Sequence, residues 1–171
     1  MKNIILIGFM GAGKTTVGKL LSREKEMLFV DTDDRIVSEQ GRTIPEIFSE
    51  SGEEHFRNLE TELLRRMQED TYNAVISVGG GMPVRPENRR LLQELGCVIY
   101  LSATKETILE RVKSDGSRPM LNGGELVSKV ECLMREREAF YRQTAHVDVR
   151  TDGRSIQHVV KIIEQETRRF R

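Results

Sequence analysis

Short apolar runs alternate along the chain with longer amphipathic segments. Runs of four or five residues rich in Ile, Val and Leu are typical of buried strands. We expect strands at Asn3–Ile7, Leu28–Asp31, 74–78, 98–101 and Val147–Arg150. Between them, apolar residues recur at three- and four-residue spacing, which predicts helices that bury one face. Strands that alternate with helices favour a parallel sheet with helices on both faces.

Several helix boundaries can be predicted from capping residues. Thr43 and Ser51 are each followed three residues later by a glutamate, Glu46 and Glu54, and this spacing is typical of a capping box. We therefore expect one helix to begin at each of these sites. The second would carry an apolar stripe of Phe56, Leu59, Leu63 and Met67, with Arg57 and Glu60 on another side. Further boundaries follow from Pro86 as a first helical turn, Gly96 as a helix end and Ser155 as a cap.

Two segments interrupt the alternation. From residue 33 to about 61, helical patterns follow one another without a strand, and residues 114–124 (SDGSRPMLNGG) are polar and rich in glycine. A loop of the second kind, between two helices, is often a mobile lid. We expect a single domain, 1–171, with a core of about 1–32, 62–111 and 125–171, an insert of about 33–61 and a lid of about 112–124.

Composition argues against several classes of function. Lys and Arg together number 27, as do Asp and Glu, so the net charge is zero and no general attraction to nucleic acid is expected. Cys97 and Cys132 lack metal-ligand spacing, and we expect both to be buried free thiols in a reducing compartment. The apolar start at 4–7 is too short for a signal peptide or a membrane span, so we expect no membrane partner and a cytoplasmic protein.

The stretch Gly8-Phe-Met-Gly-Ala-Gly-Lys-Thr15 fits the phosphate-loop pattern G-x-x-x-x-G-K-[ST] and stands between an expected strand and an expected helix. Its glycines let backbone N–H groups turn toward phosphate oxygens, and the N-terminus of the helix adds a favourable dipole. Lys14 can reach the β- and γ-phosphates, and the Thr15 hydroxyl can ligate Mg²⁺. The motif predicts a bound nucleoside triphosphate, but it does not define the reaction.

The second expected strand runs into two aspartates, in the sequence Asp31-Thr32-Asp33. Parallel strands deliver their last residues to the ligand crevice, and residues two apart on a continuing strand share a face. Asp31 could then hold Mg²⁺, directly or through water, and Asp33 could accept the proton of an attacking hydroxyl or orient it. The alternative is that Asp33 caps a helix and Asp31 is solvated.

Arg57 and the glycines Gly79, Gly80 and Gly81 are further candidates for the site. Arg57 stands three residues before Glu60, a spacing that is usually a surface ion pair of little value. A planar guanidinium also suits two-point recognition of a carboxylate. The three glycines follow the third expected strand, where they would let the backbone come close to a ligand and offer N–H donors, although a plain loop is also possible there.

The whole set of motifs resembles the shikimate kinases of the nucleoside monophosphate kinase-like superfamily, from residue 3 to about 163. The resemblance rests on the order of GFMGAGKTT, VDTD, Phe56-Arg57 with Glu60, the triple glycine, Arg118-Pro119, and Arg137-Glu-Ala-Phe-Tyr141. It implies a three-layer α/β/α fold with a five-stranded parallel sheet of order 2-3-1-4-5, a helical substrate-binding insert and a lid loop. It also implies transfer of the γ-phosphoryl of ATP to the 3-hydroxyl of shikimate, with Mg²⁺, in the route to aromatic amino acids.

The resemblance assigns roles to individual residues. Shikimate contacts are implied for Asp33, Arg57, Gly79, Gly80, Gly81 and Arg137. ATP contacts are implied for Gly11, Ala12, Gly13, Lys14, Thr15, Thr16, Arg111, Arg118 and Arg154, with Arg111 and Arg154 beside the adenine. Catalytic roles fall to Asp33, Lys14 and the lid arginine Arg118, and metal contacts to Thr15 and Asp31.

Two departures from the family pattern occur. The lid has Arg118-Pro-Met-Leu121 where Arg-Pro-Leu-Leu is usual, a volume-matched change that should cost nothing. The late helix has Arg137-Glu-Ala-Phe-Tyr141 where Arg-x-Pro-Leu-Tyr is common, so a proline kink is lost. This second change leaves Arg135 as a rival of Arg137 for the substrate carboxylate.

Other functions remain to be weighed against this one. A phosphate-loop kinase of another small hydroxylated acid, such as gluconate, would share the ATP site, but the paired arginines and the triple glycine argue against it. A GTP-dependent switch would need an N-K-x-D guanine reader, and no Asn-Lys pair occurs in the chain. We expect shikimate and ATP as partners of a free-standing monomer.

Overall fold

The computed structural model describes residues 3–114 and 123–170. The strands are β1 (Asn3–Ile7), β2 (Leu28–Asp31), β3 (Ala74–Ser77), β4 (Gly96–Ser102) and β5 (Val147–Arg150). The helices are α1 (Lys14–Glu24), α2 (Thr32–Gln40), α3 (Ile44–Asp70), α4 (Pro86–Leu95), α5 (Lys105–Ser114), α6 (Gly123–Thr144) and α7 (Ile156–Thr167). Two short 3-10 turns, η1 (Met82–Val84) and η2 (Arg168–Phe170), complete them.

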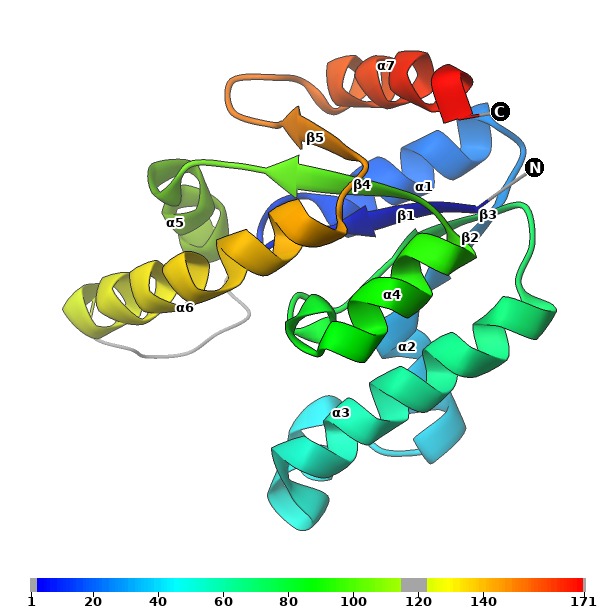
Figure 1. The fold of residues 1–171 in the computed structure, drawn as a ribbon. Coiled ribbons are helices and arrows are strands. Elements are labelled where there is room, and N and C mark those ends of the chain that lie inside the picture. The colour runs from blue at the N-terminus through cyan, green and yellow to red at the C-terminus, as the bar shows by residue number, and fades with distance from the viewer. Residues whose placement is uncertain (1–2, 115–122, 171) are drawn as a thin grey trace.

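All five strands are parallel and lie in the order β2-β3-β1-β4-β5, as predicted. Helices α1 and α7 cover one face of the sheet, and α4 and α6 cover the other (Figure 1). Because β1 is central and covered on both faces, all five of its residues are buried. The sheet therefore delivers the end of β1 to the middle of its carboxyl edge, between the ends of β3 and β4.

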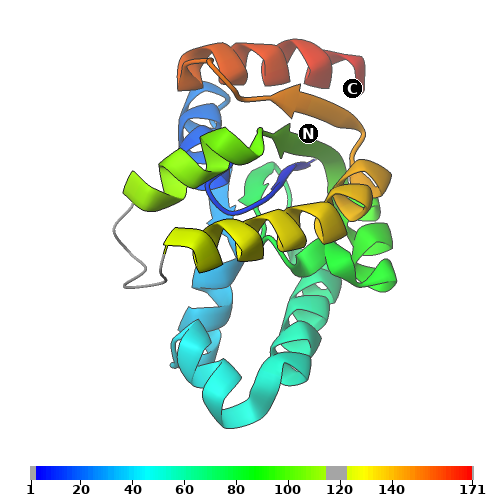
Figure 2. The ribbon, with the colours of Figure 1, turned by 90° about the vertical axis from the view of Figure 1, so that its left-hand side faces the viewer.

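The insert consists of α2 and the first half of α3, which project beyond the sheet (Figure 2). Thr43 opens α3 with the expected capping box, in which Thr43 accepts from the Glu46 N–H and Glu46 accepts from the Thr43 N–H. The second helical run begins one residue later than expected, because the helix breaks at Gly52 (φ 81°, ψ 169°). The rings of Phe48 and Phe56 pack across this break with centroids 5.0 Å apart.

Most other boundaries agree with the sequence, and the differences are local. Ser155 caps α7 by accepting from the His158 N–H, as expected. Gly96 ends α4 but is also the first residue of β4, so this strand is longer at both ends than the apolar run alone indicated. Cys97 is buried in β4, whereas Cys132 is exposed on α6 and does not confirm the expectation of two buried thiols. No helix in the described part of the chain is long and apolar enough to cross a membrane.

Candidate active site

The phosphate loop joins the end of β1 to the start of α1. Lys14 is the first residue of α1, and Gly13 before it has φ 93° and ψ 16°, a left-handed conformation that glycine adopts readily. Lys14 Nζ donates to the carbonyl oxygens of Gly8 (2.8 Å) and Phe9 (3.0 Å). Burial lowers the pKa of Lys14 to about 8, against the negative charge of Asp33, which raises it. Because the loop holds this cation in a poorly solvated place, an anion that binds there gains a strong electrostatic partner.

Asp31 and Asp33 do not share a strand face, which corrects the expectation from the sequence. β2 ends at Asp31 and α2 begins at Thr32, so Asp33 lies in the first turn of α2. The helix cap is Asp31 and not Asp33, because the Asp31 carboxylate accepts from the Asp33 N–H (3.1 Å). The Thr15 hydroxyl donates to the other oxygen of Asp31 (3.2 Å). The cap therefore fixes Asp31 beside the phosphate loop.

Asp33 has a buried carboxylate oxygen, Oδ1, that accepts no hydrogen bond from the residues that the structure describes. Burial and the neighbouring Asp31 raise the pKa of Asp33, while Lys14 lowers it. A buried polar atom without a partner is costly, so it calls for a ligand or water to complete the site. A carboxylate with a raised pKa is also a better proton acceptor than an ordinary aspartate.

Arg57 and Glu60 form a buried ion pair and not the surface pair that the sequence left open. Glu60 is fully buried, and the Arg57 side chain is 14% exposed. Arg57 Nη1 donates to Glu60 Oε2 (2.8 Å), and Nε and Nη2 both donate to Glu53. Among the described residues, these bonds occupy three of the five guanidinium N–H groups. One N–H on each terminal nitrogen is left, and such a pair suits a carboxylate.

We expect Glu60 to make the free energy of unfolding depend on pH. Burial raises the pKa of Glu60 to about 7, although Arg57 lowers it. The folded state then holds this proton more tightly than the unfolded state, so the contribution of Glu60 is greatest below pH 4.5 and is lost as the pH rises through 7. The loss amounts to roughly 1–3 kcal/mol. Urea unfolding of the wild type and of Glu60→Gln between pH 5 and 8 should therefore diverge, and parallel profiles would contradict this assignment.

Gly79, Gly80 and Gly81 follow β3 and lie against side chains of α2, α3 and α6. A β-carbon built on Gly79 would lie 2.7 Å from Asp33 Oδ1 and 3.1 Å from Glu60 Oε1, and one on Gly81 would overlap the Arg57 guanidinium. The backbone therefore approaches these groups more closely than any other residue would allow. This packing accounts for the consecutive glycines better than a plain loop does.

Gly80 faces α6. The Tyr141 hydroxyl donates to the carbonyl oxygen of Gly80 (2.6 Å), and a β-carbon on Gly80 would lie 3.8 Å from Arg137 Nη1. The Arg135 side chain is 80% exposed and pairs with Glu131 (3.7 Å). Of the two arginines that the sequence left open, Arg137 is therefore the one that faces the triple-glycine turn.

A cavity of about 450 Å³ opens beside the phosphate loop and is wide enough for a nucleoside. It gathers predicted ATP contacts from three parts of the chain, because it is lined by Gly11, Ala12, Gly13, Thr16, Val17, Arg111, Thr151, Arg154, Ile156 and Val159. Arg111 donates to the Gly11 carbonyl and to the Thr151 hydroxyl, both at 3.1 Å. These bonds hold its guanidinium plane at the mouth of the loop.

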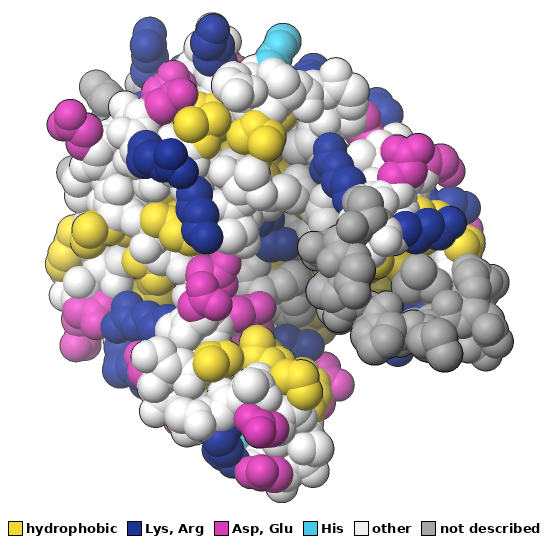
Figure 3. Space-filling model, turned by 180° about the vertical axis from the view of Figure 1, so that it is seen from behind, with side chains coloured by type: hydrophobic (Ala, Val, Ile, Leu, Met, Phe, Trp, Pro, Cys, Tyr) yellow, Lys and Arg dark blue, Asp and Glu magenta, His cyan; other side chains and the backbone are white. Residues whose placement is uncertain are grey.

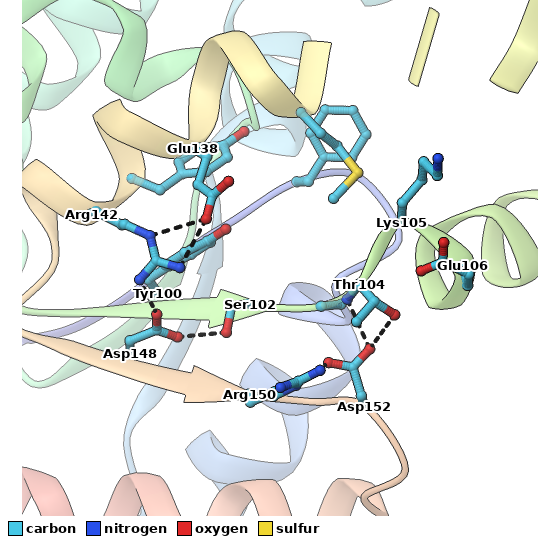
Figure 4. A pocket seen from close by; sticks show the side chains of 14 residues that line it. Tyr100, Ser102, Thr104, Lys105, Glu106, Glu138, Arg142, Asp148, Arg150 and Asp152 are labelled. Atoms are coloured by element: carbon cyan, nitrogen blue, oxygen red, sulfur yellow. Dashed lines mark hydrogen bonds and ion pairs between the residues drawn. The ribbon is translucent and has the colours of Figure 1, made fainter. Parts of the chain in front are cut away.

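A larger cavity, about 660 Å³, lies between α6, β4, β5 and the start of α5 (Figure 4). Its charged side chains neutralise one another, as Arg142 pairs with Glu138 (2.8 Å) and Asp148 (3.1 Å), and Arg150 pairs with Asp152 (2.8 Å). Its lining offers no cluster of cations for phosphate. We therefore assign the nucleotide to the smaller cavity beside the phosphate loop.

Seen from behind, the surface is hollowed between the projecting insert at the bottom and the body of the protein above it (Figure 3). Lys or Arg side chains and Asp or Glu side chains lie around this hollow. The predicted lid arginine, Arg118, lies outside the described residues, as does most of the segment 112–124.

Glu60 and Tyr141 belong to the site but were given no role from the sequence. Glu60 stands four residues after Phe56 and three before Leu63, so it falls within the apolar stripe of α3, and that spacing was the available signal. Tyr141 was named in the sequence analysis only as the last residue of the motif Arg137-Glu-Ala-Phe-Tyr141. Its hydroxyl bond to the turn depends on the crossing of α6 over the sheet, which no local pattern reveals.

Comparison with known proteins agrees with this geometry. The family model described as shikimate kinase matches residues 10–167. The chain belongs to the shikimate kinase family. A shikimate kinase of Caldicellulosiruptor bescii is 39% identical over 99% of this chain and 100% of its own length. One from Pelotomaculum thermopropionicum is 44% identical over 95% of this chain and 94% of its own length.

Solved structures of the family have the same fold. A shikimate kinase of Acinetobacter baumannii in complex with shikimate superimposes with a TM-score of 0.88 at 36% identity, covering 97% of this chain and 92% of that chain. A shikimate kinase of Bacteroides thetaiotaomicron superimposes with a TM-score of 0.90 at 30% identity, covering 98% of both chains. The family is one of ATP-using kinases, so a divalent metal is implied as well.

Gly79→Ala is expected to lower kcat/KM for shikimate by about tenfold or more, because the new methyl group must displace Asp33 or Glu60, and overpacking of this kind costs about 1–3 kcal/mol. Steady-state kinetics checks this. Gly41→Ala is a suitable control, since Gly41 has φ +62° with no atom within 4 Å of an added β-carbon. It should strain the backbone without changing the kinetics. Equal kinetics of Gly79→Ala and the wild type would contradict the close approach.

Proposed function

We propose that this chain transfers the γ-phosphoryl of ATP to the 3-hydroxyl of shikimate and releases shikimate 3-phosphate and ADP. The observation that supports it most is the position of Asp33. Its buried oxygen, which has no hydrogen-bond partner among the described residues, lies against the triple-glycine turn, and the charges of both Lys14 and Arg57 act on this carboxylate. A proton acceptor near both a phosphate-binding cation and a carboxylate-binding cation is what phosphoryl transfer to a hydroxy acid requires.

At the donor end, the phosphate loop binds ATP. Backbone N–H groups of Gly11, Gly13 and the first turn of α1 donate to the phosphate oxygens, and Lys14 stabilises the negative charge that develops on the transferred group. Gly11, Ala12, Thr16, Arg111 and Arg154 would surround the nucleoside in the cavity that they line. These contacts resemble those of any phosphate-loop enzyme, so specificity has to come from the acceptor end.

Mg²⁺ is the divalent metal that fits the donor set beside the loop. Thr15 and Asp31 offer a hydroxyl and a carboxylate oxygen within 3.2 Å of each other, and Mg²⁺ prefers oxygen ligands, one or two of them from protein and the rest from phosphate and water. When bound, the ion would neutralise charge on the β- and γ-phosphates. The cap that Asp31 forms with α2 would keep its carboxylate turned toward the ion.

At the acceptor end, Arg57 and Arg137 bind the shikimate carboxylate, and Asp33 holds the ring hydroxyls. Asp33 orients the 3-hydroxyl and accepts its proton as the phosphorus is attacked. Gly79, Gly80 and Gly81 allow the substrate ring to approach the backbone. Placing both partners in line removes much of the entropic barrier to the reaction.

The lid arginine, Arg118, completes the charge around the transferred group. We place it in the segment of about 112–124, which would close over ATP after both substrates have bound, and the insert of about 33–61 would close over shikimate. Closure would exclude water, which otherwise competes with shikimate as an acceptor. We propose that one chain carries all of these residues and acts as a monomer.

A coupled assay of ADP formation tests the proposal, with shikimate, gluconate or nucleoside monophosphates as the acceptor and ³¹P NMR of the product. We expect ADP formation to depend on shikimate and the phosphate to be on the 3-hydroxyl. Gluconate as an equal or better acceptor would instead identify a kinase of another hydroxy acid. ATP hydrolysis that no acceptor stimulates would contradict a kinase of small alcohols altogether.

A further inference from the structure

The two arginines proposed for the substrate carboxylate come from different helices. Arg57 lies on α3 and Arg137 on α6, and α4 lies between these two helices (Figures 1 and 2). Recognition of a carboxylate by two arginines requires a fixed separation of their guanidinium groups. The residues of α4 that link α3, η1 and α6 therefore bear on the geometry of the substrate site.

Asn88 of α4 links α3 to η1. It is fully buried; its Oδ1 accepts from the Thr61 hydroxyl (2.8 Å) and its Nδ2 donates to the Met82 carbonyl (3.0 Å). Thr61 follows Glu60, the partner of Arg57, and Met82 follows Gly81. One amide side chain thus joins the helical turn that carries the Arg57–Glu60 pair to the turn that this pair packs against.

Arg89 of α4 links η1 to α6. Its Nη1 donates to the carbonyl oxygens of Pro83 and Val84, both at 2.9 Å, and its guanidinium lies 4.9 Å from the centroid of the Phe140 ring. Phe140 precedes Tyr141, which donates to Gly80.

Because the backbone packs tightly at Gly81, these links determine the position of the Arg57 guanidinium. A β-carbon on Gly81 would overlap the Arg57 guanidinium, so the bare glycine backbone already lies against that guanidinium. Interiors packed this closely transmit small shifts and do not absorb them. A displacement of η1 therefore moves Arg57. Because Gly80 is bonded to Tyr141 of α6, the same displacement also changes the distance between the triple-glycine turn and Arg137.

We propose that Asn88 and Arg89 are positioning residues that hold the two carboxylate-binding arginines at a fixed separation across the triple-glycine turn. The proposal rests on the proposed function in that it assumes a carboxylate substrate at Arg57 and Arg137. Neither residue touches the substrate. Asn88 acts through Thr61 and Met82, and Arg89 acts through η1 and Phe140.

A structural role alone would make any polar link between α3 and α4 equivalent, and the chain offers a link for comparison. Gln68 of α3 donates to the carbonyl oxygen of Leu91 (2.9 Å), which lies one turn of α4 beyond Asn88. It also donates to the carbonyl oxygen of Leu64 in its own helix (3.3 Å). Gln68→Met removes this link between the same two helices without touching η1 or the glycines. It is the matched control for Asn88→Leu and Thr61→Val.

The kinetic experiment measures KM for both substrates and kcat in these variants. We expect Asn88→Leu and Thr61→Val each to raise KM for shikimate by about tenfold and to leave KM for ATP within about twofold. The double variant should raise KM for shikimate by less than the product of the two single effects, because both changes break the same Thr61–Asn88 bond. Phe140→Leu should raise KM for shikimate by about two- to threefold. Gln68→Met should change stability only.

An unchanged KM for shikimate in Asn88→Leu would overturn the proposal, as would an equal rise in the KM values for shikimate and ATP.

The arginine Nε–Hε NMR signals of the ligand-free protein give a readout that needs no substrate. The Arg57 signal should shift or broaden in Asn88→Leu and Thr61→Val and stay unchanged in Gln68→Met. An altered signal in an enzyme that does not phosphorylate shikimate would refute the proposed function and keep the positioning role. Turnover of shikimate together with an unaltered Arg57 signal in Asn88→Leu would support the proposed function and refute the positioning role.

Discussion

Asp33→Asn is expected to lower kcat by about two to four orders of magnitude, the range usual for loss of a general base, and to change KM for ATP little. The amide is nearly isosteric with the carboxylate, so the packing against Gly79 survives while the proton acceptor is lost. The phosphate loop belongs to other elements, so nucleotide binding should persist. Steady-state kinetics at saturating shikimate measures the loss.

The pH dependence of kcat in the wild type should also report the role of Asp33 as the base. Burial and Asp31 raise the pKa of Asp33 more than Lys14 lowers it. Since the base must be ionised, kcat should fall as the pH decreases through this raised pKa, at a higher pH than an ordinary aspartate would give.

Asp34→Asn is the matched control for Asp33→Asn. Asp34 is the next residue of α2, it is exposed, and its loss removes the same unit of charge from the same helical turn. Because the charge of Asp34 contributes to the raised pKa of Asp33, this control should move the acid limb slightly down and keep kcat near the wild-type value. If Asp33→Asn kept a near-normal kcat, Asp33 would have no chemical role.

The sequence predicted what depends on local pattern. Strands such as Asn3–Ile7 and Leu28–Asp31 were predicted to the residue, because a short apolar run between polar boundaries has few other solutions. The phosphate loop was recognisable because its chemistry requires fixed residue types at fixed spacing. The sheet order came from the family resemblance, since propensity alone does not order strands.

The errors concern features that local pattern does not determine. Asp33 was placed on a strand because nothing between β2 and α2 resembles a loop, and the Asp31 cap makes the change within one residue. Glu60 was placed outside the apolar stripe because charge is expected at the surface, whereas Arg57 compensates the burial of one of its two carboxylate oxygens. Cys132 was expected to be buried because its helix has an apolar pattern, but it lies on the exposed side.

Arg57→Ala is expected to raise KM for shikimate by about 10- to 100-fold, because hydrogen bonds to a charged group contribute about 1.5–3 kcal/mol. The same change leaves Glu60 fully buried without its partner, which costs about 3–5 kcal/mol of stability. This deficit should grow as the pH rises, because Glu60 without Arg57 resists ionisation even more strongly. Kinetics and urea unfolding of one variant therefore report two separate functions of one arginine.

The double variant Arg57→Ala/Glu60→Gln separates these functions. Removing the buried charge should recover most of the stability that Arg57→Ala loses, while KM for shikimate stays high because the cation is still absent. Arg65→Ala is the control on the same helix, since Arg65 pairs with Glu87 at the surface and should change neither quantity by much. A double variant that also recovered KM would show that Arg57 acts only by holding Glu60. The carboxylate would then have to be bound by Arg137 alone.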